Sequence, residues 1–137
     1  MNRNARIAGY AAIALAALVI TYIQYLRFPA GGIAGFWAQM KVNHITRGIT
    51  VDLAFFVLAA SLFMIGEARR LNIPFVWLYV ALGYLVDISV VFPIFLIVRE
   101  RAMARAGEDT SAFTITDMIV ASAITGAIIW QVWFVLQ

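Results

Sequence analysis

The sequence predicts an all-α protein, an integral membrane four-helix bundle that forms one domain over residues 1–137. Of these residues 64% are hydrophobic and 12% are charged. A soluble domain of this size cannot bury so much apolar surface, whereas a bilayer accepts it. Most charges lie between four apolar runs, each near the roughly 20 residues that a helix needs to cross a bilayer. We therefore expect helices at about 7–26, 48–67, 72–99 and 112–136.

The first apolar run lacks charge between its flanking arginines, and no small-x-small cleavage pattern precedes Phe28. We expect this run to be a retained first helix, not a signal peptide that is removed. The connection that follows, residues 28–47, contains one proline and several glycines, which break regular structure. Its Phe36 and Trp37 suit the headgroup level, which predicts a short interfacial helix at about 33–42.

The other three runs each carry an acidic residue. Asp52 and Glu67 bracket a second span that is short, and Asp117 lies in the first turns of the fourth. The third run contains Asp87, and as one straight helix it would extend for roughly 40 Å, enough to tilt or protrude. We expect Pro93 to kink this helix. Short connections between four helices predict an up-down bundle.

In such a bundle, both termini lie on one face of the membrane. The positive-inside rule then compares the basic residues of the two faces. The terminal face would carry Arg3, Arg6, Arg69 and Arg70, and the other face Arg27, Lys41, Arg47, Arg99, Arg101 and Arg105. The larger count on the second face predicts that both termini lie on the non-cytoplasmic side of a plasma (inner) membrane.

Composition also excludes several classes of function. The net charge is +3, but the basic residues flank apolar runs and form no continuous stripe, which favours membrane anchoring over nucleic-acid binding. The absence of cysteine excludes disulfides, thiolate metal sites and a cysteine nucleophile. The only histidine, His44, excludes paired-histidine haem and leaves a single axial ligand to a haem or chlorin as the cofactor hypothesis. We expect no cofactor and no metal.

Several short motifs in the middle of the chain form a pattern that resembles a known family. They read Asp52-Leu-Ala-Phe-Phe56, Glu67-Ala-Arg-Arg-Leu71, Trp77 and Pro93-Ile-Phe-Leu-Ile-Val-Arg-Glu100. This pattern resembles small membrane proteins of bacteria and fungi that are grouped as a domain of unknown function. The resemblance covers the middle third to half of the chain, and implies a fold but no activity. The family often has glycine where this chain has Asp87, and the first connection and fourth helix look like additions.

Asp87 is the most distinctive candidate site residue. A carboxylate deep in a bilayer costs roughly 2.5–3.5 kcal/mol on insertion scales, and no basic residue lies at comparable depth on the predicted helices. We expect the carboxyl to be protonated and neutral. One interpretation makes it a proton donor, an ion site or the polar end of a pocket for an apolar ligand. The other makes it an interhelix hydrogen bond that fixes packing.

Asp52 and Asp117 are the other two candidates, since both open predicted helices. Negative charge in a first turn suits the helix dipole and its free amide groups, so a capping role is one interpretation. The alternative is an acidic pair near His44, Arg47 and Arg99 that binds a cation or donates a proton. The sequence leaves open whether the two carboxylates meet.

Two further patterns predict contacts. Glu67 with Arg69 or Arg70, and Arg99 with Glu100, have the spacing of ion pairs that anchor helix ends at the interface. Ser122-x-x-x-Gly126 and Ala123-x-x-x-Ala127 give the fourth helix a face of small residues. Such a face permits close helix contact, so we expect it to pack on the first helix or to face a partner chain.

The leading hypothesis for function is a non-catalytic accessory or scaffold element that contacts the lipid bilayer and another membrane protein or a second copy. The absence of a paired acid and base favours a protein that is not an enzyme. One alternative is an intramembrane enzyme acting on a lipid-like or terpenoid substrate, with Asp87, Asp52 or Asp117 as general acid. A second alternative is a small proton- or cation-coupled transporter.

Overall fold

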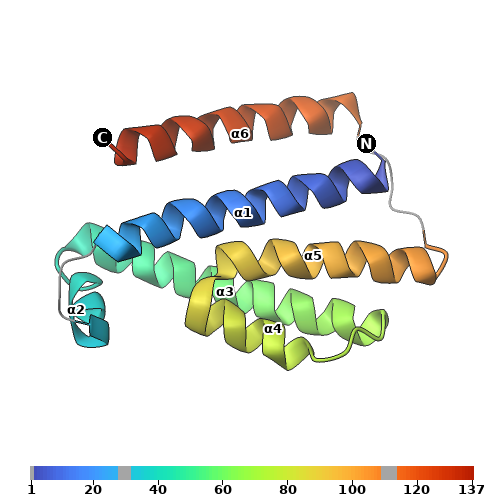
Figure 1. The fold of residues 1–137 in the computed structure, drawn as a ribbon, viewed down its shortest axis with the longest axis horizontal. Coiled ribbons are helices and arrows are strands. Elements are labelled where there is room, and N and C mark those ends of the chain that lie inside the picture. The colour runs from blue at the N-terminus through green and yellow to red at the C-terminus, as the bar shows by residue number, and fades with distance from the viewer. Residues whose placement is uncertain (1, 28–31, 109–113) are drawn as a thin grey trace.

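The computed structural model of the protein describes residues 2–27, 32–108 and 114–137, and these form helices with no strand among them (Figure 1). In chain order the elements are α1 (Arg3–Arg27), α2 (Gly32–Gln39), α3 (His44–Arg70), α4 (Val76–Leu82), the π-helical turn η1 (Gly83–Asp87), α5 (Ile88–Arg105) and α6 (Ile115–Val135).

Four segments are long and apolar enough to cross a membrane, which confirms the predicted all-α class and the number of apolar helical runs. They are Arg3–Arg27, His44–Arg70, Val76–Arg105 and Ile115–Val135. The predicted ranges match them apart from a few residues at the ends, and the predicted start at 112 lies outside the described residues. The short interfacial helix expected at about 33–42 corresponds to α2.

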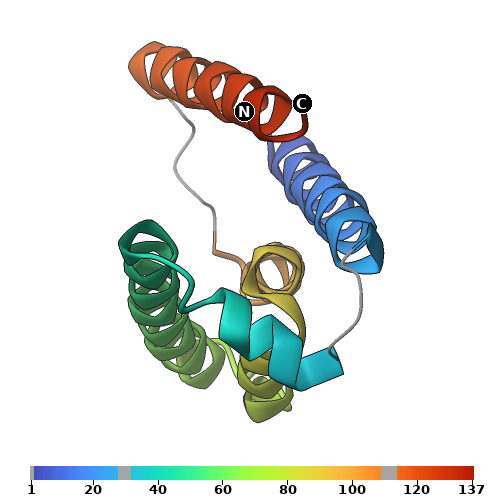
Figure 2. The ribbon, with the colours of Figure 1, turned by 90° about the vertical axis from the view of Figure 1, so that its left-hand side faces the viewer.

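The third segment reverses direction, so the prediction of one continuous helix over 72–99, kinked at Pro93, is wrong. The backbone at Asp87 is extended, with φ −169° and ψ 117°, and α5 then returns beside α4 (Figures 1 and 2). The rings of Tyr79 and Phe95 lie 5.6 Å apart between centroids, whereas sixteen residues along a straight helix span about 24 Å. The reversal is at Asp87, six residues before the expected kink at Pro93. Val76–Arg105 is therefore a helical hairpin.

The helices α3 and α5, which precede and end the hairpin, each finish with a residue in the left-handed conformation. After α3, Asn72 adopts a left-handed conformation (φ 52°), and the Ile73 N–H donates to the Ala68 carbonyl at 2.9 Å. After α5, Gly107 does the same (φ 71°), and the Glu108 N–H donates to the Met103 carbonyl at 3.0 Å. This geometry satisfies the last carbonyls of a helix and turns the chain away from its axis.

The core lies between α3 and the hairpin. Met64 of α3 and Phe95 of α5 are fully buried there. The buried residues around them are Ala60, Ala68, Ile73, Val76 and Ile88. Phe92 of α5 meets α3 edge to face, through Phe56 and Phe63. Alanine beside bulky side chains lets the helices approach closely, so α3 packs tightly on the hairpin.

The fourth predicted helix, α6, contributes nothing to this core. None of its residues is buried, and a Cβ built on Gly126 would meet nothing within 4 Å. A Cβ built on Gly9 of α1 is equally free. The expected tight packing between the first and fourth helices is therefore wrong, and the small-residue face of α6 is open.

The hairpin also changes which charges share an end of the molecule. α1 begins, and α3 and α5 end, at the same end, which we call the arginine end (Figure 1). It carries Arg3, Arg6, Arg69, Arg70, Arg99, Arg101 and Arg105. The prediction that Arg99, Arg101 and Arg105 lie opposite Arg6 is wrong. α6 runs from the arginine end to the opposite end, so α1 begins and α6 ends at different ends of the molecule, contrary to the expected arrangement.

Candidate functional site

The charged residues of the sequence motifs meet at the arginine end. Glu100 of α5 is buried, with 2% of its surface exposed, and accepts two hydrogen bonds from Arg6 of α1. The Arg6 Nε lies 3.2 Å from Oε1, and an Nη lies 3.1 Å from Oε2. The Nε of Arg3 lies 4.0 Å from the same carboxylate. This fork geometry joins helices whose paired residues are 94 positions apart in the sequence.

A second carboxylate joins α3 to α5. Glu67 accepts two hydrogen bonds from Arg70, at 2.9 and 3.0 Å, and one from the Nε of Arg99. The Arg99 guanidinium also lies 5.8 Å from the ring centroid of Phe63. Arg70 reaches on to the carboxylate of Glu108 at 2.5 Å. The two carboxylates and their arginines thus hold the ends of α1, α3 and α5 together.

This network confirms the predicted Glu67–Arg70 pair, and Arg99 comes within 4.0 Å of Glu100. Sequence reasoning missed the bidentate partner of Glu100, Arg6, because a straight third helix put the two residues on opposite faces of the membrane. Arg6 directly precedes the first apolar run and Glu100 follows the third, and this position at the end of a run was the only sequence signal that could have suggested the pair. Each carboxylate is held by guanidinium groups from more than one position of the chain.

Asp87 lies at the tip of the hairpin and caps α5. Its Oδ1 accepts from the Ser89 N–H at 2.8 Å and from the Ser89 hydroxyl at 2.5 Å. Its Oδ2 is buried and has no hydrogen-bond partner. The hydroxyls of Ser61 and Thr125 donate within their own helices, to the carbonyls of Val57 and Ala121. The hydrogen bonds of this carboxyl are therefore local, and among the described residues it makes no interhelix hydrogen bond, which was one of its two interpretations.

Asp52 and Asp117 lie toward opposite ends of the molecule, so the acidic pair does not form (Figure 1). Asp117 caps α6 as expected: its carboxylate accepts from the Thr114 N–H at 2.8 Å and hydroxyl at 2.7 Å. Asp52 is exposed and is the ninth residue of α3, because that helix is capped by Asn43. His44 is exposed at the start of α3, far along that helix from the end where Glu67 meets Arg99.

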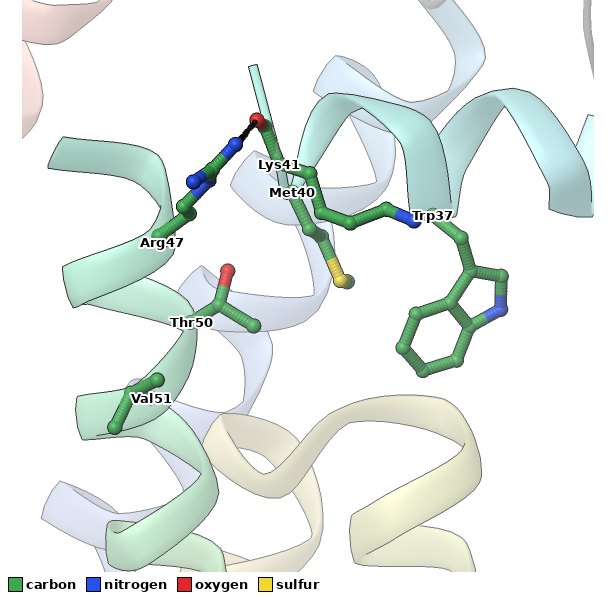
Figure 3. A pocket seen from close by; sticks show the side chains of 6 residues that line it. All are labelled: Trp37, Met40, Lys41, Arg47, Thr50 and Val51. Atoms are coloured by element: carbon green, nitrogen blue, oxygen red, sulfur yellow. Dashed lines mark hydrogen bonds between the residues drawn. The ribbon is translucent and has the colours of Figure 1, made fainter. Parts of the chain in front are cut away.

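A hollow of about 500 Å³ opens between α2 and the start of α3 (Figure 3). It is lined by Trp37, Met40, Lys41, Arg47, Thr50 and Val51. The Arg47 guanidinium donates two hydrogen bonds to the Lys41 carbonyl, at 3.2 and 3.1 Å, and so ties the connection to α3. The walls are almost wholly apolar, which suits a lipid chain more than a polar ligand. None of the three candidate aspartates lines it.

The described residues contain no group of three histidine, aspartate or glutamate side chains that could hold a metal ion. The charged clusters of this chain pair acids with arginines, and guanidinium groups do not ligate metals. The arrangement at the arginine end can fasten helices and face lipid headgroups.

A model of a known protein family matches residues 9–101 of the chain. The matched range includes the first connection, which is therefore part of the shared sequence and not an addition, and it ends before α6. Neither the curated proteins nor the solved structures give a match to the chain. Because the match covers more than half of the sequence, the chain belongs to DUF2834, a family of proteins of unknown function.

Proposed function

We propose that this small membrane protein is a non-catalytic accessory or scaffold element of the plasma (inner) membrane, one domain that contacts lipid and another membrane-embedded helix. The observation that carries the proposal is the engagement of two acids of the family motifs. Glu67 and Glu100 are both paired with arginines across helix ends. Residues used in this way build a fold, so these two acids are not available for a reaction.

The exposure of α6 supports the proposed contact with another membrane-embedded helix. Its 21 residues include none that is buried, and Ser122 and Gly126 form part of an open small-residue face. Lipid covers an apolar helix at little cost, but small residues at this spacing let another helix approach its backbone closely. Because α6 lies outside the matched range, it is the element that would adapt this chain to its own partner.

A second candidate function rests on the Oδ2 of Asp87, which is buried without a hydrogen-bond partner. In an intramembrane enzyme acting on a lipid-like or terpenoid substrate, Asp87 would be the general acid. In a proton- or cation-coupled transporter it would carry the ion. A buried carboxyl oxygen without a hydrogen-bond partner is unfavourable unless a ligand reaches it, and this supports the second candidate.

The first experiment separates these functions by chemistry. Lipid extracts of cells producing the natural chain would be compared by mass spectrometry with extracts of cells producing Asp87→Asn, Asp52→Asn or Asp117→Asn. Proton and cation uptake would be measured in liposomes that contain each purified protein. We expect neither a product nor a flux that depends on any of the three carboxylates. A lipid product or a flux that disappears in Asp87→Asn would replace the scaffold proposal with the second candidate.

The second experiment tests the partner contact. Membranes solubilised in mild detergent would be resolved by native electrophoresis, with Gly126→Leu compared with the matched exposed change Ile129→Leu. We expect an assembly larger than the monomer, reduced by Gly126→Leu and unaffected by Ile129→Leu. Two differently tagged copies would distinguish self-association from a foreign partner. A natural chain that is monomeric both in this extract and in lipid nanodiscs would overturn the scaffold proposal.

A further inference from the structure

We propose that the arginine end binds the anionic phospholipid headgroups of the cytoplasmic leaflet, and that Val76–Arg105 enters and leaves the bilayer on that same side. The chain then crosses the membrane three times, by α1, α3 and α6, with its start inside the cell and its end outside. This inference is independent of whether the protein is a scaffold or an enzyme.

Each arm of the hairpin is too short to cross the membrane. From Val76 to Asp87 the chain runs for twelve residues, about 18 Å of helix, before it reverses. The apolar part of the return arm, from Ile88 to Val98, is about 16 Å long. Neither arm spans a hydrocarbon layer of roughly 30 Å. At the turn, Gly83 and Ile88 are buried against the protein, and the exposed side chains between them, Tyr84, Leu85 and Val86, are aromatic or aliphatic.

Three arginine side chains at the arginine end remain available to bind lipid headgroups. Glu67 and Glu100 are already engaged within the protein by Arg6, Arg70 and Arg99. Arg69, Arg101 and Arg105 are all exposed, and in the described part of the chain no ion pair involves them. They stand where helices leave the apolar layer, at the height of lipid phosphates. Guanidinium groups bind phosphate oxygens in the same forked geometry as carboxylates.

The basic residues are unequally divided between the two ends of the molecule. Seven of the ten basic residues lie at the arginine end, and the other three, Arg27, Lys41 and Arg47, lie at the opposite end. Short connections rich in arginine and lysine remain on the cytoplasmic side, where the leaflet is anionic. The hairpin thus reverses the orientation that a count over four crossings gave, because it moves Arg99, Arg101 and Arg105 to the side of Arg3.

The absence of cysteine makes the orientation directly measurable, since each introduced thiol is the only one present. Val42→Cys and Ala106→Cys place exposed thiols beyond α2 and beyond α5. A membrane-impermeant maleimide would be added to intact cells that produce the full chain, and again after permeabilisation. We expect Val42→Cys to be labelled in intact cells, and labelling of Ala106→Cys to be lost unless the membrane is opened.

The labelling pattern separates the two parts of the inference. If both thiols are labelled from the same side, the third segment crosses the membrane and the hairpin is overturned. If they are labelled from opposite sides with Ala106→Cys outside, the orientation and the lipid assignment are overturned. Neither readout depends on a partner or on catalysis, so the proposed function is tested separately.

The lipid partner is tested with Arg69→Gln/Arg101→Gln/Arg105→Gln in nanodiscs of phosphatidylcholine with or without phosphatidylglycerol. Native mass spectrometry would report the bound lipids. We expect the natural chain to retain phosphatidylglycerol in preference to phosphatidylcholine, and the triple variant to lose that preference. Arg27→Gln/Lys41→Gln, at the opposite end, should retain it. Equal retention of both lipids by the natural chain would overturn the assignment, even if the triple variant failed to accumulate.

Discussion

Arg6 and Glu100 form a buried, two-point ion pair between the start of α1 and the end of α5. The two hydrogen bonds are 3.2 and 3.1 Å long, and 5% and 2% of the surfaces of the two residues are exposed. Two charges so far from water must remain together, because either one alone would be left without compensation. The pair therefore fixes how the first helix sits on the hairpin.

Replacing Glu100 by Gln should lower the free energy of unfolding by about 3–5 kcal/mol, the usual cost of leaving a buried charge without its partner. The measurement is denaturant-induced unfolding in detergent micelles, followed by tryptophan fluorescence. Arg6→Met/Glu100→Leu, which removes both charges, should recover much of the loss.

Glu108→Gln is the matched control for that measurement. Glu108 pairs with Arg70 at 2.5 Å, but both side chains are about 40% exposed. An exposed pair contributes at most about 1 kcal/mol. Equal losses from the two substitutions would contradict the conclusion that the Arg6–Glu100 pair is the one that joins the helices.

Phe95→Ala should destabilise the protein by about 3–5 kcal/mol, because Phe95 is fully buried between α3 and α4 and its removal leaves a cavity. Ile128→Ala in α6, where the side chain is 53% exposed, should change stability by less than about 0.5 kcal/mol. Thermal unfolding in the same detergent would compare them. A large effect of Ile128→Ala would show that α6 packs on this chain.

Asp87→Asn should leave stability within about 0.5 kcal/mol of the natural protein. The carboxamide oxygen can still accept from the Ser89 N–H, and Asn caps helices as well as Asp does. Asp87→Ala removes the acceptor and should cost about 1 kcal/mol. If Asn proved as damaging as Ala, the charge of Asp87 and not its capping oxygen would be the important property.

Gly83→Ala should destabilise the hairpin, because the added Cβ would lie 2.8 Å from the Cδ1 of Ile88. Overpacking of this kind costs about 1–3 kcal/mol. Ile88→Val removes that Cδ1 atom, so the same glycine change should cost less in an Ile88→Val background. A double-mutant cycle of unfolding free energies measures the coupling. Additive losses would mean that the two residues do not constrain the turn.

Local patterns were enough to predict most helices and several helix ends. The apolar runs located α1, α3 and α6, and Asp117 lies in the first turn of α6 as the sequence predicts. The Glu67–Arg70 pair followed from i,i+3 neighbours on one helix face. These features depend on residues close together in the chain, and for that reason composition and spacing could identify them.

The hairpin could not be predicted in the same way. The apolar run through Asp87 has the length of a single crossing, and the extended backbone at Asp87 requires no unusual residue. Without the reversal, Arg6 and Glu100 were assigned to opposite faces, and the ion pair was missed.

The sequence by itself determined that this is a membrane-type, all-α chain with four apolar segments and charged helix ends, because hydrophobicity and helical length are properties of each segment alone. Only the tertiary structure decided that the third segment returns to its starting side, that seven basic residues share one end, and that Glu100 pairs with Arg6. Those outcomes depend on packing among Met64, Phe95 and Tyr79, residues distant in sequence whose contacts no local pattern encodes.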